Sequence, residues 1–346
     1  MCKFLRLPGM GILRLYQPAF RQIRRLSIFS AIIATSLHSA DNGLAIANPR
    51  LGSVLDEQSN QLRLVDGIPG SAALGGVITA GTPIEQAWIV PQAKRALVRF
   101  VGQSGLAVID WNGSPQILQA EDLKFEGAPV AAISPSGKAF GLFANGGLES
   151  WRIGASGLIR LWRANLNSEN NPSSLAISDD GELVAAALPG RVVVVQAGAQ
   201  SAATIAETES FGAMSFAHDS HSFVLGPESS NAVLLFDSLP GRSNVEIQWE
   251  STQPERLAGV GFSGDNAFIA TASSTDIGGQ IRLFTSSDGR AKAVFETRTT
   301  PNGIFRANGN AVFQLTTSAK ATNLMLDGDV EEPRLVTVAG QEISND

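Results

Sequence analysis

One short phrase recurs along this chain at nearly constant spacing. Its clearest copy is ISPSGKAFGLF (residues 133–143), in which an apolar residue, a turn of Ser, Pro, Asp or Gly type and a polar residue precede a second apolar run. The copies begin 44, 44, 39, 46 and 43 residues apart, at Ile89, Ile133, Ile177, Phe216, Phe262 and Phe305. A period of roughly 40–45 residues built from short apolar runs is typical of propeller blades, because helical repeats are usually shorter and place apolar residues every 3.6 positions.

Each full repeat contains two predicted hairpins. In the first repeat, Gln86–Val90 and Lys94–Phe100 flank one turn, and residues 105–111 and Gln116–Gln119 flank Asn112-Gly113, a dipeptide typical of two-residue hairpin turns. Four strands closed by such turns define a propeller blade. The sequence therefore predicts an all-β fold, without a long amphipathic helix or a second domain.

The number of blades follows from counting hairpins. Residues 48–69 read as one hairpin that resembles the second half of a repeat without its first half, and the next stretch is a connection with a possible strand at Gly76–Thr79. We therefore predict six complete four-stranded blades plus an N-terminal half-blade within residues 48–338. A ring with seven positions is favoured, and a six-blade ring with the hairpin packed outside is the alternative. Residues 339–346 are predicted to be a C-terminal tail.

Residues 1–47 have the pattern of an export signal. Basic residues that include Arg14, Arg21, Arg24 and Arg25 precede an apolar run from Leu26 to Leu37, and Ala45-Ile46-Ala47 satisfies the rule of small residues before a cleavage site. The apolar run is too short to span a bilayer. We expect a signal peptide, no stable membrane span, and a mature protein in the periplasm or outside the cell.

Charge and cysteine content limit the partners of the remaining chain. Residues 1–47 hold six of the 26 basic residues but one of the 32 acidic residues, so residues 48–346 carry 20 basic against 31 acidic side chains, a formal charge of −11. Such a surface disfavours nucleic acids and anionic lipids as partners. Cys2 is the only cysteine, so residues 48–346 contain no disulfide or thiol nucleophile.

The strands predicted to line the axis contain few side chains that could act in catalysis or bind a metal. They read QAWIV, PVAAI, SSLAI, GAMSF, AGVGF and NGIFR, and Arg306 is their only charged residue. Propeller enzymes need carboxylates, histidines or metal ligands near the axis. His218, Asp219 and His221 occupy a turn that we interpret as solvated, because a zinc site needs three or four convergent ligands. We expect no catalytic residue, metal or cofactor.

The turn phrase also carries a family resemblance. Ile133–Phe140 and Ile177–Val184 resemble the xSPDGxxLA-type turn of bacterial exported β-propellers with WD40-like, YVTN-like or TolB-like repeats, over roughly residues 50–338. The WD40 signature itself is weak, since Asp110-Trp111 is the only Asp-Trp dipeptide. The resemblance implies a rigid exported propeller of the loose bacterial class.

Three functions are compatible with such a chain. The leading expectation is an exported binding or scaffold module for a protein, peptide or glycan. The alternatives are a propeller hydrolase or lactonase acting on a small substrate, and a structural component of a cell-envelope assembly. Recognition usually lies in loops of irregular length on a rigid scaffold. The charged residues of such links and their neighbours are the predicted contact residues: Arg99, Glu121, Asp122, Lys124, Glu126, Glu255, Arg256 and Asp276.

Overall fold

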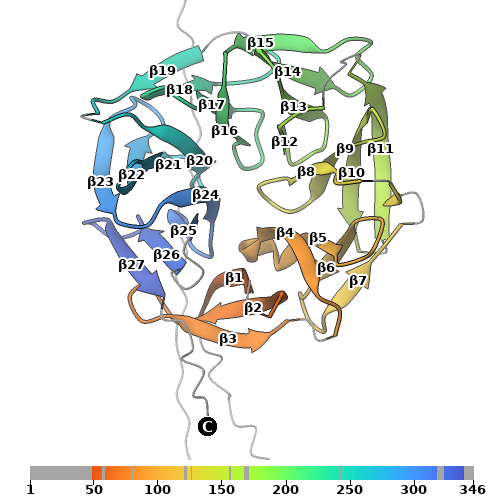
Figure 1. The fold of residues 1–346 in the computed structure, drawn as a ribbon, viewed down its shortest axis with the longest axis horizontal. Helices are drawn as coiled ribbons and strands as arrows, with labels where there is room; N and C mark the ends of the chain where they lie inside the picture. Colours follow the sequence, from red (N-terminus) through yellow and green to blue (C-terminus); the bar gives the residue numbers. More distant parts are fainter. Residues whose placement is uncertain are drawn as a thin grey trace, which may run out of the picture. The chain divides into compact units, whose positions relative to one another are not determined.

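Every predicted full repeat folds into a four-stranded antiparallel sheet, and the sheets stand around a central axis (Figure 1). The computed structural model describes residues 49–56, 59–78, 81–120, 123–125, 127–155, 157–166, 171–241, 244–251, 253–317 and 323–338. The predicted signal peptide and the predicted C-terminal tail lie outside the described residues. Within the described ranges, no helix is long and apolar enough to cross a membrane.

Each full blade runs from an innermost to an outermost strand in chain order (Figure 1). The first three full blades are β4 (Ile84–Val90), β5 (Arg95–Phe100), β6 (Ala107–Asp110), β7 (Gln116–Leu118); β8 (Val130–Ile133), β9 (Ala139–Ala144), β10 (Gly147–Gly154), β11 (Gly157–Asn165); and β12 (Ser174–Ile177), β13 (Leu183–Leu188), β14 (Arg191–Gln196), β15 (Ala203–Glu207). The next three are β16 (Phe211–Phe216), β17 (Phe223–Pro227), β18 (Ala232–Phe236), β19 (Asn244–Gln248); β20 (Arg256–Phe262), β21 (Phe268–Thr275), β22 (Gly278–Thr285), β23 (Ala291–Thr297); and β24 (Pro301–Arg306), β25 (Val312–Thr317), β26 (Asn323–Asp327), β27 (Arg334–Val338).

The N-terminal blade has three strands, β1 (Arg50–Asp56), β2 (Gln61–Asp66) and β3 (Ala73–Val77). It completes a ring of seven positions, so the favoured arrangement is confirmed and the six-blade alternative is wrong. The blade packs against the last full blade through a buried cluster that includes Leu51, Val65 and Met325. The third strand begins at Ala73, three residues before the strand that the sequence offered only as possible.

The direction of β1 shows which strand this blade lacks. The N–H of Asn308, in the turn after inner strand β24, donates to the carbonyl of Leu51 at 2.7 Å. The N–H of Ile84, at the start of inner strand β4, donates to the carbonyl of Asn60 at 2.8 Å. β1 therefore begins where the inner strands end, and it runs like the second strand of the other blades. The described N-terminal blade therefore lacks only its innermost strand, whereas the predicted half-blade lacked the whole first half of a repeat.

The core lies between neighbouring blades. All six residues of β13 are buried, because alternate side chains pack against different neighbours. Val184 and Ala186 join the cluster shared with the preceding blade, whereas Leu183 and Ala185 join the cluster shared with the following blade. A sheet buried on both faces requires a continuous apolar run, which explains LVAAAL and RVVVVQ in β13 and β14.

The recurring turn phrase has a local structural cause. Ser178 Oγ accepts the N–H of Leu183 at 3.0 Å and donates to Asp180 at 2.6 Å. Gly181 has a φ of 75°, in the left-handed region, and a Cβ there would lie 2.5 Å from Leu161 Cδ1. Serine, aspartate and glycine in this order therefore close the first hairpin of the blade. We call the turn between the first and second strands of each full blade its inner turn.

Candidate functional site

The inner strands enclose a cavity on the axis with a volume of 340 Å³. All six inner strands of the full blades line it, as the sequence predicted for these segments. The cavity extends to the inner turns, where residues Gln92, Pro135, His218 and Arg306 line its end. We call this end the turn-side mouth and the opposite face the link side. Among the described residues that line the cavity, only His218 and Arg306 are ionisable.

Backbone groups give this cavity most of its polarity. Each inner strand lies at the edge of its sheet and pairs with one neighbour only. The other edge carries peptide N–H and C=O groups without a ladder partner, as in any edge strand. Trp88, Met214 and Phe305 add apolar surface, and Phe305 is 42% exposed. The cavity therefore offers hydrogen-bond donors, acceptors and apolar contacts together.

A buried carboxylate joins three blades beside the turn-side mouth. Asp179 accepts the N–H of Ser136 at Oδ1 and the N–H of Asp219 at Oδ2, each at 2.7 Å. Its side chain is 4% exposed. Since the three residues belong to the inner turns of consecutive blades, Asp179 fixes the spacing of these turns.

Further side chains continue this connection around the ring. Asn266 Oδ1 accepts the N–H of His218 at 2.8 Å, and Asn266 Nδ2 donates to the His218 carbonyl at 2.9 Å. Asn310 makes the matching reciprocal pair with Asp265, with both bonds at 2.8 Å. Gln92 Nε2 donates to the carbonyl of Pro135 at 3.0 Å. The inner turns of the six full blades thus form a hydrogen-bonded chain from Gln92 to Asn310 that holds the turn-side mouth in shape.

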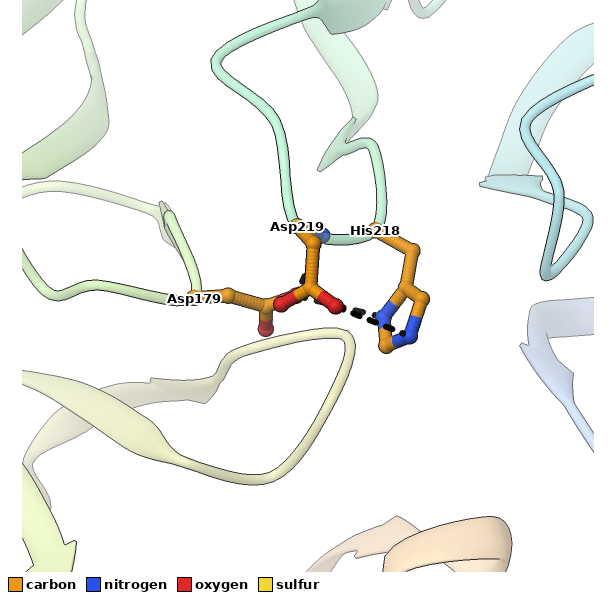
Figure 2. Close-up of side chains that lie close together, drawn as sticks. All are labelled: Asp179, His218 and Asp219. Carbon is orange, nitrogen blue, oxygen red and sulfur yellow. Dashed lines mark hydrogen bonds and ion pairs between the residues drawn. The ribbon is translucent and has the colours of Figure 1, made fainter.

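Asp179, His218 and Asp219 form a compact cluster at this mouth (Figure 2). His218 Nδ1 lies 3.2 Å from Asp179 Oδ2, and His218 Nε2 lies 3.5 Å from Asp219 Oδ2. Lys138 Nζ pairs with Asp219 Oδ1 at 2.6 Å, and this hydrogen bond holds the pKa of Asp219 below its ordinary value. Imidazole and carboxylate groups suit a divalent cation. Both oxygens of Asp179 and one oxygen of Asp219 are already engaged, however, which favours a structural role.

The sequence indicated two members of this cluster, His218 and Asp219, because they lie in one turn together with His221. In the structure, His221 pairs instead with Asp180 at 2.7 Å. Asp179 was missed because it belongs to the preceding repeat. The available signal was the equivalent position of Asp179 and Asp219 in their turn phrases, since equivalent turns of consecutive blades are neighbours.

Arg306, the last residue of β24, is partly buried at the mouth. Its guanidinium lies against the backbone of Gly264 in the neighbouring blade. Burial lowers the pKa of Arg306 from its ordinary value, and the charges of Asp179, Asp265 and Asp329 act in the opposite direction. Arg306 makes no hydrogen bond or ion pair with any other residue that the structure describes.

The predicted contact residues lie away from this mouth. Lys124, Arg256 and Asp276 are exposed on the link side, in links or at the start of β20. Arg99 pairs with Glu85 at 2.6 Å near the same side. Three other predicted residues lie outside the described part of the chain: Glu121, Asp122 and Glu126.

Glu255 belongs to the blade interior rather than to an open loop. Its side chain is 0% exposed and accepts two hydrogen bonds, each 2.7 Å long, from the guanidinium of Arg282, which is 3% exposed. Arg282 also lies 4.9 Å from the ring centroid of Trp249. Burial alone would raise the pKa of Glu255, but hydrogen bonds from Arg282 and Ser251 outweigh it and hold the pKa below 4.5.

The fold and the axial cavity define a seven-bladed β-propeller, and comparisons with solved structures agree on the fold. No family model matches the sequence, and no curated protein matches it. Among 1106 solved chains with a similar structure, Hsv2 from Kluyvelomyces marxianus has a TM-score of 0.57 and 10% identity, over 84% of this chain and 97% of that chain. At this identity the similarity concerns the fold alone.

Two further matches have TM-scores under 0.5. The Dos1 propeller has a TM-score of 0.49 and 15% identity, over 73% of this chain and 71% of that chain. Dihydro-heme d1 dehydrogenase NirN in complex with DHE has a TM-score of 0.47 and 17% identity, over 72% of this chain but only 54% of that chain. Neither match supports an assignment of activity.

The role of Asp179 leads to a stability prediction. Asp179→Ala leaves two backbone N–H groups without their acceptor, so we expect the free energy of unfolding to fall by about 2–4 kcal/mol. Asp276→Ala is the control because Asp276 is exposed. This variant should change the free energy of unfolding by less than about 0.5 kcal/mol. Urea unfolding measures both variants. Equal stability of the two variants would contradict the bridging role of Asp179.

The Glu255–Arg282 pair predicts a pH dependence. Glu255→Gln removes one charge of a buried pair and should cost about 3 kcal/mol at neutral pH. Because the folded-state pKa of Glu255 lies below its unfolded value, the contribution of this carboxylate is present above the unfolded pKa and is lost as the pH falls through the folded-state pKa. The stability difference between wild type and variant should therefore narrow in acid. Urea unfolding measures this difference. A difference in the free energy of unfolding that stays constant across this pH range would contradict the prediction.

Proposed function

We propose that this protein is an exported binding module whose ligand enters the turn-side mouth of the axial cavity. One observation carries the proposal: the unpaired edges of six inner strands surround a cavity of 340 Å³, and none of the described residues that line it carries a carboxylate. Acid–base or metal catalysis needs such groups at the reacting centre, whereas recognition needs shape, apolar surface and hydrogen bonds.

The size of the cavity suits a small molecule, a side chain or the tip of a loop. A protein, peptide or glycan partner inserting such a group would gain backbone hydrogen bonds without displacing any strand. Lys124, Arg256 and Asp276 remain proposed contacts for a partner on the link side. The proposal of export rests on the sequence of residues 1–47.

A metal-dependent hydrolase is the second candidate, and the cluster of Asp179, His218 and Asp219 favours it, because His218 lines the cavity. In that case Asp219 and His218 would hold the cation, and the open end of the cavity would hold the substrate. The two candidates differ in one respect: a binding module returns its ligand chemically unchanged.

Phe305→Asp tests the proposed binding site. A carboxylate at the mouth should block apolar contact, so ligands found by a thermal-shift screen against wild type should lose their effect on this variant. Ile277→Asp makes the same change at a side chain that is 76% exposed in the turn between β21 and β22, and it should respond like wild type.

Mass spectrometry of recovered ligands separates the two candidate functions. Unchanged ligands support binding, and products that disappear on treatment with a chelator support the hydrolase. Ligands that raise the melting temperatures of Phe305→Asp and wild type equally would contradict binding at the turn-side mouth.

A further inference from the structure

The unpaired guanidinium of Arg306 is the most specific chemical feature of the axial cavity. Within the part of the chain that the structure describes, Arg306 is one of two ionisable residues in the cavity lining, and it is the one that carries a permanent charge. It makes no ion pair with another described residue, although three carboxylates are near enough to influence it. A partly buried cation without a hydrogen-bonded partner loses hydration, and the charges of these carboxylates offset only part of that loss.

The surrounding carboxylates are committed to other groups. Asp179 binds the N–H groups of Ser136 and Asp219. Asp265 binds Ser263 and Asn310. Asp329 accepts the N–H groups of Asn310 and Ala311 at 2.8 and 2.6 Å. Turning any of these carboxylates toward Arg306 would break bonds within the ring of inner turns.

Two other polar atoms at the turn-side mouth lack hydrogen-bond partners. Gln92 Oε1 and His218 Nδ1 are both buried without one, even though the Asp179 carboxylate lies close to His218 Nδ1. Native structures rarely leave buried polar atoms unsatisfied. A carboxylate that enters from outside the protein would accept hydrogen bonds from Arg306, whereas Gln92 Oε1 is itself an acceptor and would need a donor group on the same ligand.

We propose that Arg306 binds a carboxylate ligand with an apolar body, the body lying against Phe305 in the axial cavity. A guanidinium matches a planar carboxylate with two parallel hydrogen bonds. A monovalent anion is favoured over a phosphate dianion because Asp179, Asp265 and Asp329 oppose additional negative charge at this mouth. The inference rests on the proposed binding function and gives its ligand a chemical class.

Two sources could supply this group, a free organic acid or the C-terminal carboxylate of a peptide. Phenylacetate and the peptide Gly-Gly-Phe represent them, and phenylacetamide and the peptide amide are the uncharged controls. Calorimetric titration of the full chain should show that each acid that binds does so at least about tenfold more tightly than its amide, the difference expected for a charge-assisted pair. The tighter of the two acids identifies the source.

Variants of Arg306 separate recognition from structure. Arg306→Gln should lose the preference for acid over amide, and Arg306→Lys should keep part of it. Arg191→Gln removes the same charge from an exposed position on β14 and should behave like wild type. The melting temperature of Arg306→Gln should equal or exceed that of wild type, because no described partner is lost.

Failure of both acids to bind the wild type would overturn the inference, as would an Arg306→Gln variant that still prefers acids to amides. Equal binding of acid and amide, abolished by Phe305→Asp, would also overturn it while leaving the cavity as a binding site. That last result distinguishes failure of the carboxylate from failure of the proposed function.

Discussion

The burial of both faces of every blade is the constraint on which this structure depends. β13 places alternate side chains into two different interfaces, and all of them are buried. A sheet of this kind cannot expose either face to water without losing the apolar contacts that hold it. The blades must therefore stack until the ring closes. The three-stranded N-terminal blade closes it through side-chain packing with the last blade rather than through a shared sheet.

Closure leaves the inner edges of the sheets around the axis, and the inner turns decide how firmly they are held. Asp179, Asn266 and Asn310 each bond across a blade boundary and so connect the inner turns of neighbouring full blades. Arg306 lies among these turns but makes none of the hydrogen bonds that connect them. A rigid frame that surrounds an unpaired cation and unpaired peptide edges is organised for binding before any ligand arrives, which reduces the ordering cost of binding.

The sequence predicted most of the fold because the constant spacing of the repeat shows where each blade begins. The copies of the turn phrase placed the inner strands that line the cavity, and the missing first hairpin indicated an incomplete N-terminal blade. Contacts between repeats were harder to predict. Asp179 lies 40 residues before Asp219, and only their equivalent positions indicated that they meet.

The burial of charged side chains was also difficult to predict from the sequence. Glu255 read as a loop carboxylate, although Arg282 within the apolar run QIRLF signalled that a buried cation needed an acidic partner. The lack of a partner for Arg306 could not be read from the sequence at all, because it depends on how three carboxylates from three blades use their oxygens.

Amide hydrogen exchange, with and without a ligand identified by the thermal-shift screen, tests the central claim most directly. Unpaired N–H groups on the inner edges of β8, β12 and β24 should exchange quickly in the free protein, because they have no ladder partner. The account predicts that a bound ligand slows exchange at these strands and their inner turns and leaves the link side around Asp276 unchanged. Protection confined to the link side, with no change along the inner strands, would contradict it.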